Sequence, residues 1–119
     1  MSGVIPYLIR AYCEWIEDSN LTPYLLVNTK SKGVVVPEGY DANGKMVLNI
    51  SSSATMNREI SNEVISLKAR FQGKSQKIVI PCDAVLSIYA QENGEGMMFD
   101  NKETNQEKGG KKLGLKILD

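Results

Sequence analysis

The sequence predicts a small, strongly bent antiparallel sheet or barrel that is capped by one N-terminal helix and followed by a polar tail. Apolar residues recur with a helical spacing near the start of the chain, and they alternate with a period of two from residue 21 to residue 99. Residues 101–112 contain no apolar residue at all, so they cannot help to bury a core. We therefore expect a folded domain over 1–100, a flexible linker over 101–112 and a separate tip over 113–119.

The expected helix covers residues 7–17, with Pro6 at the first helical position, where its missing N–H costs nothing. Its polar residues form one narrow stripe, and the rest of its surface is apolar. A helix that packs on a single core normally shows one apolar face of about 100°. We expect this helix to pack against its own domain and against a second copy of the chain. The predicted dimer contacts are Leu8, Tyr12, Trp15 and Ile16.

Short strands are expected wherever apolar and polar residues alternate between turn signals. Asn43-Gly44 is a hairpin signal ahead of one strand, and the turn over 72–75 joins two others. Pro37 and Pro81 end the strands that they follow, because proline has no N–H to donate. The expected strands are 24–29, 33–36, 45–50, 64–71, 76–80, 85–89 and 97–99. The fold class is thus mainly β with one helix.

The side chains that carry most enzymatic chemistry are missing. The sequence has no histidine, which removes Ser-His and Cys-His pairs, the most frequent general base and most zinc sites. Cys13 lies among apolar residues, and Cys82 has no basic neighbour nearby in the sequence. We expect two buried free thiols, no disulfide, no metal site and no cofactor. The sequence therefore predicts a binding protein and not an enzyme.

Charge is balanced over the whole chain but not along it. Residues 1–100 hold nine Lys or Arg against eleven Asp or Glu, and residues 101–119 hold five Lys against three acidic residues. A mildly acidic folded part lacks the basic footprint of a nucleic-acid binder. No run of 18 apolar residues and no basic region ahead of an apolar one is present. We expect no membrane association, no secretory signal and a cytoplasmic location.

Four long segments resemble the SspB family of bacterial adaptor proteins. They are PYLIRAYCEWIEDSNLTPYLLVN over 6–28, VVVPEGYDANGKMVLNIS over 34–51, SLKARFQGKSQKIVIP over 66–81 and AVLSIYAQENGEGMMF over 84–99. They follow one another in order with few gaps, and the ARF-x-G and IYA-x-ENG motifs are specific. The resemblance implies a closed Sm-like barrel and a two-fold homodimer through the N-terminal helix.

The resemblance also implies two binding functions. One is binding of the ssrA degradation tag, an unstructured peptide at the C-terminus of stalled translation products. The other is docking of the tip over 113–119 on the N-terminal zinc-binding domain of ClpX, whose zinc belongs to that partner. The implied ClpX-binding residues are Lys111, Lys112, Leu115, Lys116, Ile117 and Leu118. Composition alone leaves open a terminal strand that folds back onto the sheet.

An extended peptide needs an exposed strand edge or shallow channel with apolar pockets and a few polar or charged partners. Lys68 or Arg70 would meet acidic residues of the tag, and Met56 or Met98 would adapt to its side chains. Core packing of the apolar residues and a solvated strand face for the charged ones are the alternatives. The candidates lie over 49–56, over 68–71 and at Met98, and the residues singled out are Asn49, Ile50, Ser51, Met56, Asn57, Lys68, Ala69, Arg70, Phe71 and Met98.

An Sm-like RNA-binding module is the competing function, because that barrel is common in RNA-binding proteins. Such a module needs base-stacking aromatic residues interleaved with basic ones. Only Phe71 follows a basic patch of this kind, and the folded part is acidic. The sequence therefore favours the adaptor.

Overall fold

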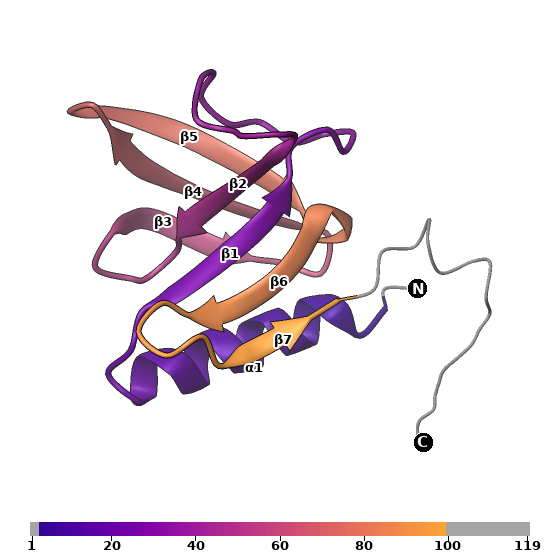
Figure 1. Cartoon of the computed structure of the whole chain (residues 1–119), viewed down its shortest axis with the longest axis vertical. Coiled ribbons are helices and arrows are strands. Elements are labelled where there is room, and N and C mark those ends of the chain that lie inside the picture. Colours follow the sequence, from indigo (N-terminus) through magenta and orange to yellow (C-terminus); the bar gives the residue numbers. More distant parts are fainter. Residues whose placement is uncertain (1–2, 100–119) are drawn as a thin grey trace.

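The computed structural model describes residues 3–99 and confirms a mainly β domain with one N-terminal helix (Figure 1). The predicted linker and tip, 101–119, lie outside the described residues. No helix within 3–99 is long and apolar enough to cross a membrane. In chain order the elements are α1 (Ile5–Asp18), β1 (Pro23–Asn28), β2 (Lys45–Asn49), β3 (Thr55–Ile60), β4 (Val64–Phe71), β5 (Lys74–Pro81), the short helix η1 (Cys82–Ala84), β6 (Val85–Ala90) and β7 (Gly96–Met98).

The strands form two antiparallel sheets. The first has the order β2-β1-β6-β7 and the second the order β3-β4-β5. Figure 1 shows the second sheet behind and to one side of the first, while α1 runs below β6 and β7. No ladder of hydrogen bonds joins the two sheets within residues 3–99, where one isolated bridge, Val35 with Val79, links β5 to the β1–β2 connection. The predicted closure into a barrel is therefore not confirmed.

Two segments differ from the sequence prediction. Residues 33–36 do not form a strand, since Gly33 has a φ of 90° and Pro37 offers no N–H, which leaves room for one bridge only. Residues 55–60 do form a strand, β3, although their sequence does not alternate between apolar and polar. A bulge in β3 shifts its register with β4 between Met56 and Glu59, so the side chains of β3 do not alternate regularly between the two faces of the sheet.

One hydrophobic core lies between the helix and the two sheets. On α1 the buried residues are Pro6, Ile9, Cys13 and Ile16. Strand β4 alternates as predicted, with Ile65 and Leu67 buried, Lys68 and Arg70 exposed. Both cysteines are buried and free, as the sequence predicted. The helix is thereby fixed against β1, β3 and β6, so its position determines what lies beside β3.

Candidate peptide-binding site

Strand β3 is the edge of the second sheet. Its inner edge pairs with β4, and no other strand within residues 3–99 pairs with its outer edge. The N–H and C=O groups along such an edge can hydrogen-bond an added strand. The fold therefore offers a place where an extended peptide can bind through its backbone.

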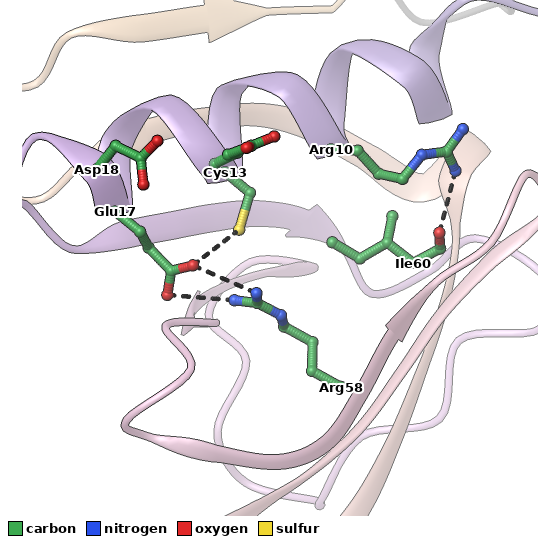
Figure 2. Close-up of a pocket in the computed structure, with 7 residues that line it drawn as sticks. Arg10, Cys13, Glu17, Asp18, Arg58 and Ile60 are labelled. Carbon is green, nitrogen blue, oxygen red and sulfur yellow. Dashed lines mark hydrogen bonds and ion pairs between the residues drawn. The ribbon is translucent and has the colours of Figure 1, made fainter.

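A β-bulge interrupts the pairing of β3 with β4. Met56 pairs with Lys68 and Glu59 pairs with Ser66, so three steps along β3 match two steps along β4. A bulge of this kind leaves one extra residue on a strand and redirects the side chains that follow it. Here it turns the side chain of Arg58 towards α1, where it meets the carboxylate of Glu17 (Figure 2).

A shallow groove of about 440 Å³ lies where the turn over 51–54 meets β3, β4 and the start of β5. Small side chains make up half of its lining, and Met56 adds a long apolar side chain that is 55% exposed. Small residues leave room for the backbone of a peptide, and methionine adapts to different side chains. The lining residues are Ser53, Ala54, Thr55, Met56, Lys68, Ala69, Arg70 and Ser75.

The groove carries two positive charges. Lys68 and Arg70 are both exposed, and neither makes an ion pair within residues 3–99. Charged groups without a partner at the rim of a binding site attract ligands of the opposite sign and exclude ligands of the same sign. The groove is therefore suited to an extended peptide that carries acidic residues.

The structure brings four of the predicted tag-binding residues together in this groove: Met56, Lys68, Ala69 and Arg70. Of three others, Asn49 and Ile50 directly precede the turn and Ser51 is its first residue. Ile50 is fully buried and Ser51 is 8% exposed. The side chain of Ile50 packs in the core, and the side chain of Asn49 accepts a hydrogen bond from the N–H of Ser51.

The remaining three predicted residues do not line the groove. Asn57 lies on the bulge, with a φ of 55° that asparagine tolerates better than most residues. Phe71 is half-buried and packs against Tyr40, with ring centroids 4.7 Å apart. Met98 is 79% exposed but belongs to β7, in the other sheet. Phe71 thus contributes to packing, whereas Asn57, next to Met56 on β3, and Met98 are exposed outside the lining of the groove.

The residues singled out from the sequence omit four that line the groove: Ser53, Ala54 and Thr55, which lie within the expected stretch 49–56, and Ser75, which lies outside it. One of them has a signal in the sequence, because the tight turn at Gln72-Gly73 fixes the hairpin register and sets Ser75 opposite Arg70. No such signal marks the other three. They join the groove through the path of the turn, which depends on contacts with a distant helix.

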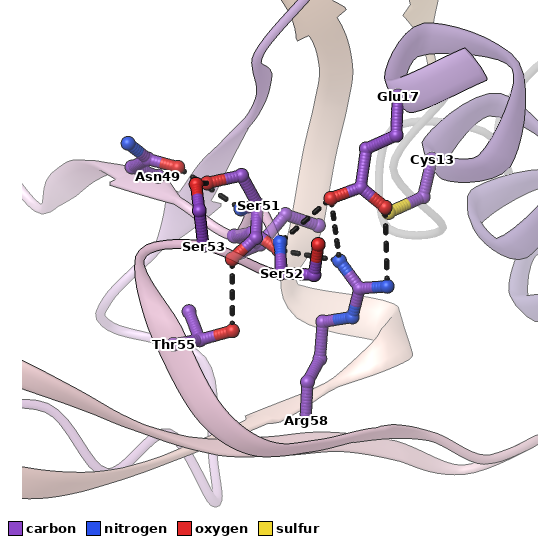
Figure 3. A network of polar contacts seen from close by, with 9 residues as sticks. Cys13, Glu17, Asn49, Ser51, Ser52, Ser53, Thr55 and Arg58 are labelled. Carbon is purple, nitrogen blue, oxygen red and sulfur yellow. Dashed lines mark hydrogen bonds and ion pairs between the residues drawn. The ribbon is translucent and has the colours of Figure 1, made fainter.

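Hydrogen bonds inside the turn over 51–54 determine part of its shape (Figure 3). The carboxamide oxygen of Asn49 accepts the N–H of Ser51 at 2.9 Å. The hydroxyl of Thr55 donates to the carbonyl of Ser51 at 2.9 Å, and the N–H of Ala54 donates to the same carbonyl at 3.1 Å. The carbonyl of Ser51 thus accepts the two hydrogen bonds that close the turn.

Two arginines connect α1 to β3 across a polar cleft of about 360 Å³ (Figure 2). Arg10, on the helix, donates to the carbonyl of Ile60 at 3.0 Å. In the opposite direction Arg58, on β3, donates to both carboxylate oxygens of Glu17, at 3.3 and 3.2 Å. Arg58 also donates to the carbonyl of Ile50 at 2.7 Å. These contacts fix the distance between the helix and the edge strand.

The environment of Glu17 favours its ionised form. Partial burial opposes ionisation, but the backbone N–H of Ser52 and the guanidinium of Arg58 more than offset it, so the pKa of Glu17 is lowered from 4.5. At neutral pH the carboxylate is therefore charged, and it accepts the Ser52 N–H at 2.6 Å.

The outer face of α1 forms a second apolar surface. Ala11, Tyr12 and Trp15 line a shallow depression of about 350 Å³, and the rings of Tyr12 and Trp15 meet edge to face at 5.7 Å. Of the predicted dimer contacts, Trp15 is 49% exposed, and Leu8 and Tyr12 are half-buried against the core. Ile16 is 1% exposed and packs in the core. The face available to a partner is therefore the aromatic one.

Neither thiol has the properties of a nucleophile. Burial raises the pKa of Cys13 to about 11, and it also raises the pKa of Cys82. No group of three or more potential metal ligands occurs within residues 3–99. The predicted ClpX-binding residues, which start at Lys111 and end at Leu118, lie outside the described residues.

Comparison with known proteins identifies relatives of this chain. The family model described as "Stringent starvation protein B" matches residues 3–115. The stringent starvation protein B homolog of Haemophilus influenzae is 48% identical over 102 residues, which cover 86% of this chain and 68% of that protein. The match extends over the helix, both sheets and the groove.

The lowered pKa of Glu17 predicts a pH-dependent contribution to stability. A carboxylate with a depressed pKa in the folded state stabilises the fold above its unfolded pKa, and this stabilisation is lost as the pH falls through the folded value. Glu17→Gln should therefore lower the free energy of unfolding by about 1 kcal/mol at pH 7, a modest value because water screens the pair. The loss should become smaller at an acid pH below the lowered pKa of Glu17, where the carboxylate is protonated.

Urea denaturation at the two pH values measures this difference. Glu14→Gln is the matched control, because Glu14 is on the same helix but is exposed and makes no ion pair within the described residues. Equal losses for Glu17→Gln at both pH values would contradict the prediction.

Proposed function

We propose that this chain, which belongs to the stringent starvation protein B family, is a proteolysis adaptor. In this proposal it binds the ssrA degradation tag and holds tagged proteins at the ClpX unfoldase of the ClpXP protease. The observation that carries the proposal is the groove where residues 53–56 meet the end of β4 and the start of β5, with two exposed cations, Lys68 and Arg70, in its lining.

The groove suits a peptide in an extended conformation. Backbone groups at the edge of β3 would hydrogen-bond the peptide main chain, and Met56 would cover an apolar side chain of the tag. Lys68 and Arg70 would pair with acidic residues. In this proposal the tag binds reversibly and is not changed chemically, so no reactive side chain is needed; burial raises the pKa of Cys13 to about 11. The chain is proposed as a binder and not as an enzyme.

Delivery to the protease requires a second attachment. We assign it to the tip over 113–119, where Leu115, Ile117 and Leu118 supply apolar anchors and Lys111, Lys112 and Lys116 supply charge. The partner is the N-terminal zinc-binding domain of ClpX. Once the adaptor holds the tag near ClpX, tag capture becomes intramolecular, which raises the apparent affinity by about 10² or more.

The exposed aromatic face of α1 supports a homodimer. An apolar depression over Ala11, Tyr12 and Trp15 would be covered by the same face of a second copy. A dimer carries two grooves and two tips, so it gains avidity for ClpX. Because the tag arises during translation, the proposed site of action is the bacterial cytoplasm.

The competing function, RNA binding, gains no support from the site. Phe71, the aromatic residue next to the basic patch, packs against Tyr40 and does not present its ring for stacking on a base. We therefore retain the adaptor as the proposed function.

Charge reversal in the groove tests peptide binding. Lys68→Glu with Arg70→Glu should weaken binding of a fluorescein-labelled ssrA peptide by about tenfold or more, since two attractive contacts become repulsive. Fluorescence anisotropy measures the affinity. The matched control is Lys32→Glu with Lys45→Glu, which makes the same change in net charge at exposed positions away from the groove. An equal effect in both pairs, or no binding by the unmodified chain, would overturn the proposal.

A polar substitution on α1 tests the dimer. Trp15→Glu should yield a monomer by light scattering, because it introduces a charge into the apolar face. Val47→Glu is the control, since Val47 is on β2 and its exposure equals that of Trp15, 49%. The dimer is assigned to the wrong surface if Trp15→Glu retains the dimer mass or if Val47→Glu dissociates it.

A further inference from the structure

We propose that Glu17 is a positioning residue for the groove: from helix α1 its carboxylate holds the turn over 51–54, in which Ser53 and Ala54 line the groove and Ser52 does not. The proposal rests on the proposed function, because it concerns the same groove. It adds a residue that does not line the groove.

The turn over 51–54 is a weak element when considered alone. Ser52, Ser53 and Ala54 are exposed, and the hydrogen bonds within the turn join residues at most four positions apart. Small polar loops of this kind open easily, because they bury few apolar contacts. Ser53 and Ala54 nevertheless line the groove, so the shape of the groove depends on how the turn is held.

Glu17 supplies the restraint from outside the turn. The N–H of Ser52 donates to Oε2 of Glu17 at 2.6 Å, across 35 positions of sequence (Figure 3). Within the described residues this is the hydrogen bond that joins residues 51–54 to a distant part of the chain. Because the acceptor is charged, the bond is stronger than one between neutral groups.

Glu17 is itself held in place. Arg58 contacts both oxygens of its carboxylate, at 3.3 and 3.2 Å, so the carboxylate cannot rotate freely. The same guanidinium donates to the carbonyl of Ile50, directly before the turn, at 2.7 Å. The core residues Cys13 and Ile16 fix the helix that carries Glu17. The turn is thus connected through Glu17 to the core-packed helix.

The position of Ser52 suggests a substitution that separates this role from general stability. The N–H of Ala54 bonds to the carbonyl of Ser51, so Ser52 is the second residue of a four-residue turn. Proline is favoured at this position because its ring pre-sets φ. Proline also has no N–H. Ser52→Pro therefore removes the hydrogen bond to Glu17, while the proline ring restrains the backbone of the turn instead.

The experiment compares four proteins: the unmodified chain, Glu17→Ala, Ser52→Pro and the double variant. Anisotropy with a fluorescein-labelled ssrA peptide gives the affinity of each. Glu17→Ala should weaken binding about three- to tenfold, the size expected when one or two loop side chains must be ordered on binding. Ser52→Pro should bind within about twofold of the unmodified chain, and adding Glu17→Ala to it should change the affinity by less than about twofold.

Hydrogen exchange of the segment over 51–54, measured without peptide, gives an independent readout. Exchange should be faster in Glu17→Ala than in the unmodified chain, and it should return to slow exchange in the double variant. Should Glu17→Ala fail to fold, Glu17→Gln is used in both backgrounds. It keeps an acceptor oxygen but loses the charge, so it should weaken binding less.

Three results would overturn the proposal, and they can be told apart from failure of the proposed function. If Glu17→Ala and Glu17→Gln bind the peptide as well as the unmodified chain does, Glu17 has no positioning role. If they weaken binding equally with and without Ser52→Pro, their effect is general destabilisation. If exchange over 51–54 is unchanged, the turn does not depend on Glu17. Absence of peptide binding by the unmodified chain overturns the proposed function, and this inference with it.

Discussion

The arrangement of the helix, the edge strand and the turn depends on the hydrogen bonds that the guanidinium of Arg58 makes. It bonds to the Glu17 carboxylate on α1 and to the Ile50 carbonyl ahead of the turn. Side chains alternate between the two faces of a strand, so without the extra residue of the bulge Arg58 would point to the opposite face. One irregularity in a six-residue strand therefore connects three parts of the molecule.

The free edge of β3 carries a risk of unwanted pairing, and it lies in the sheet that holds the proposed peptide site. Exposed edges invite pairing with other chains, and proteins commonly limit this by placing charges and bulges there. Here the bulge interrupts β3, and the exposed cations Lys68 and Arg70 lie on the neighbouring strand. The same features would discourage pairing with apolar or basic segments and favour an acidic extended peptide. The bulge and the two cations would thus both limit pairing with wrong partners and favour the proposed tag.

Sequence patterns predicted those strands and turns whose formation depends on residues close together in the chain. The alternation over 64–71 gave the bounds of β4, and the turn expected over 72–75 gave its hairpin partner, although the turn is shorter than expected and β5 begins at Lys74. Strand β3 was missed, because its bulge breaks the alternation that identifies a strand. Apolar residues such as Ile16 and Ile50 could not be divided between core and surface, since both are apolar and only the packing of distant segments buries them. Closure of a barrel is likewise a property of the whole fold and has no local signal.

Residues 53–56, the end of β4 and the start of β5 form the proposed peptide site. Its location can be tested by two-dimensional ¹H–¹⁵N NMR of the labelled chain, titrated with unlabelled ssrA peptide. The largest shifts should fall on residues 53–56, on 68–70 and on Ser75, while β2 and β7 change little. Shifts that instead cluster around Val47 and Met98, on the opposite edges of the other sheet, would contradict it.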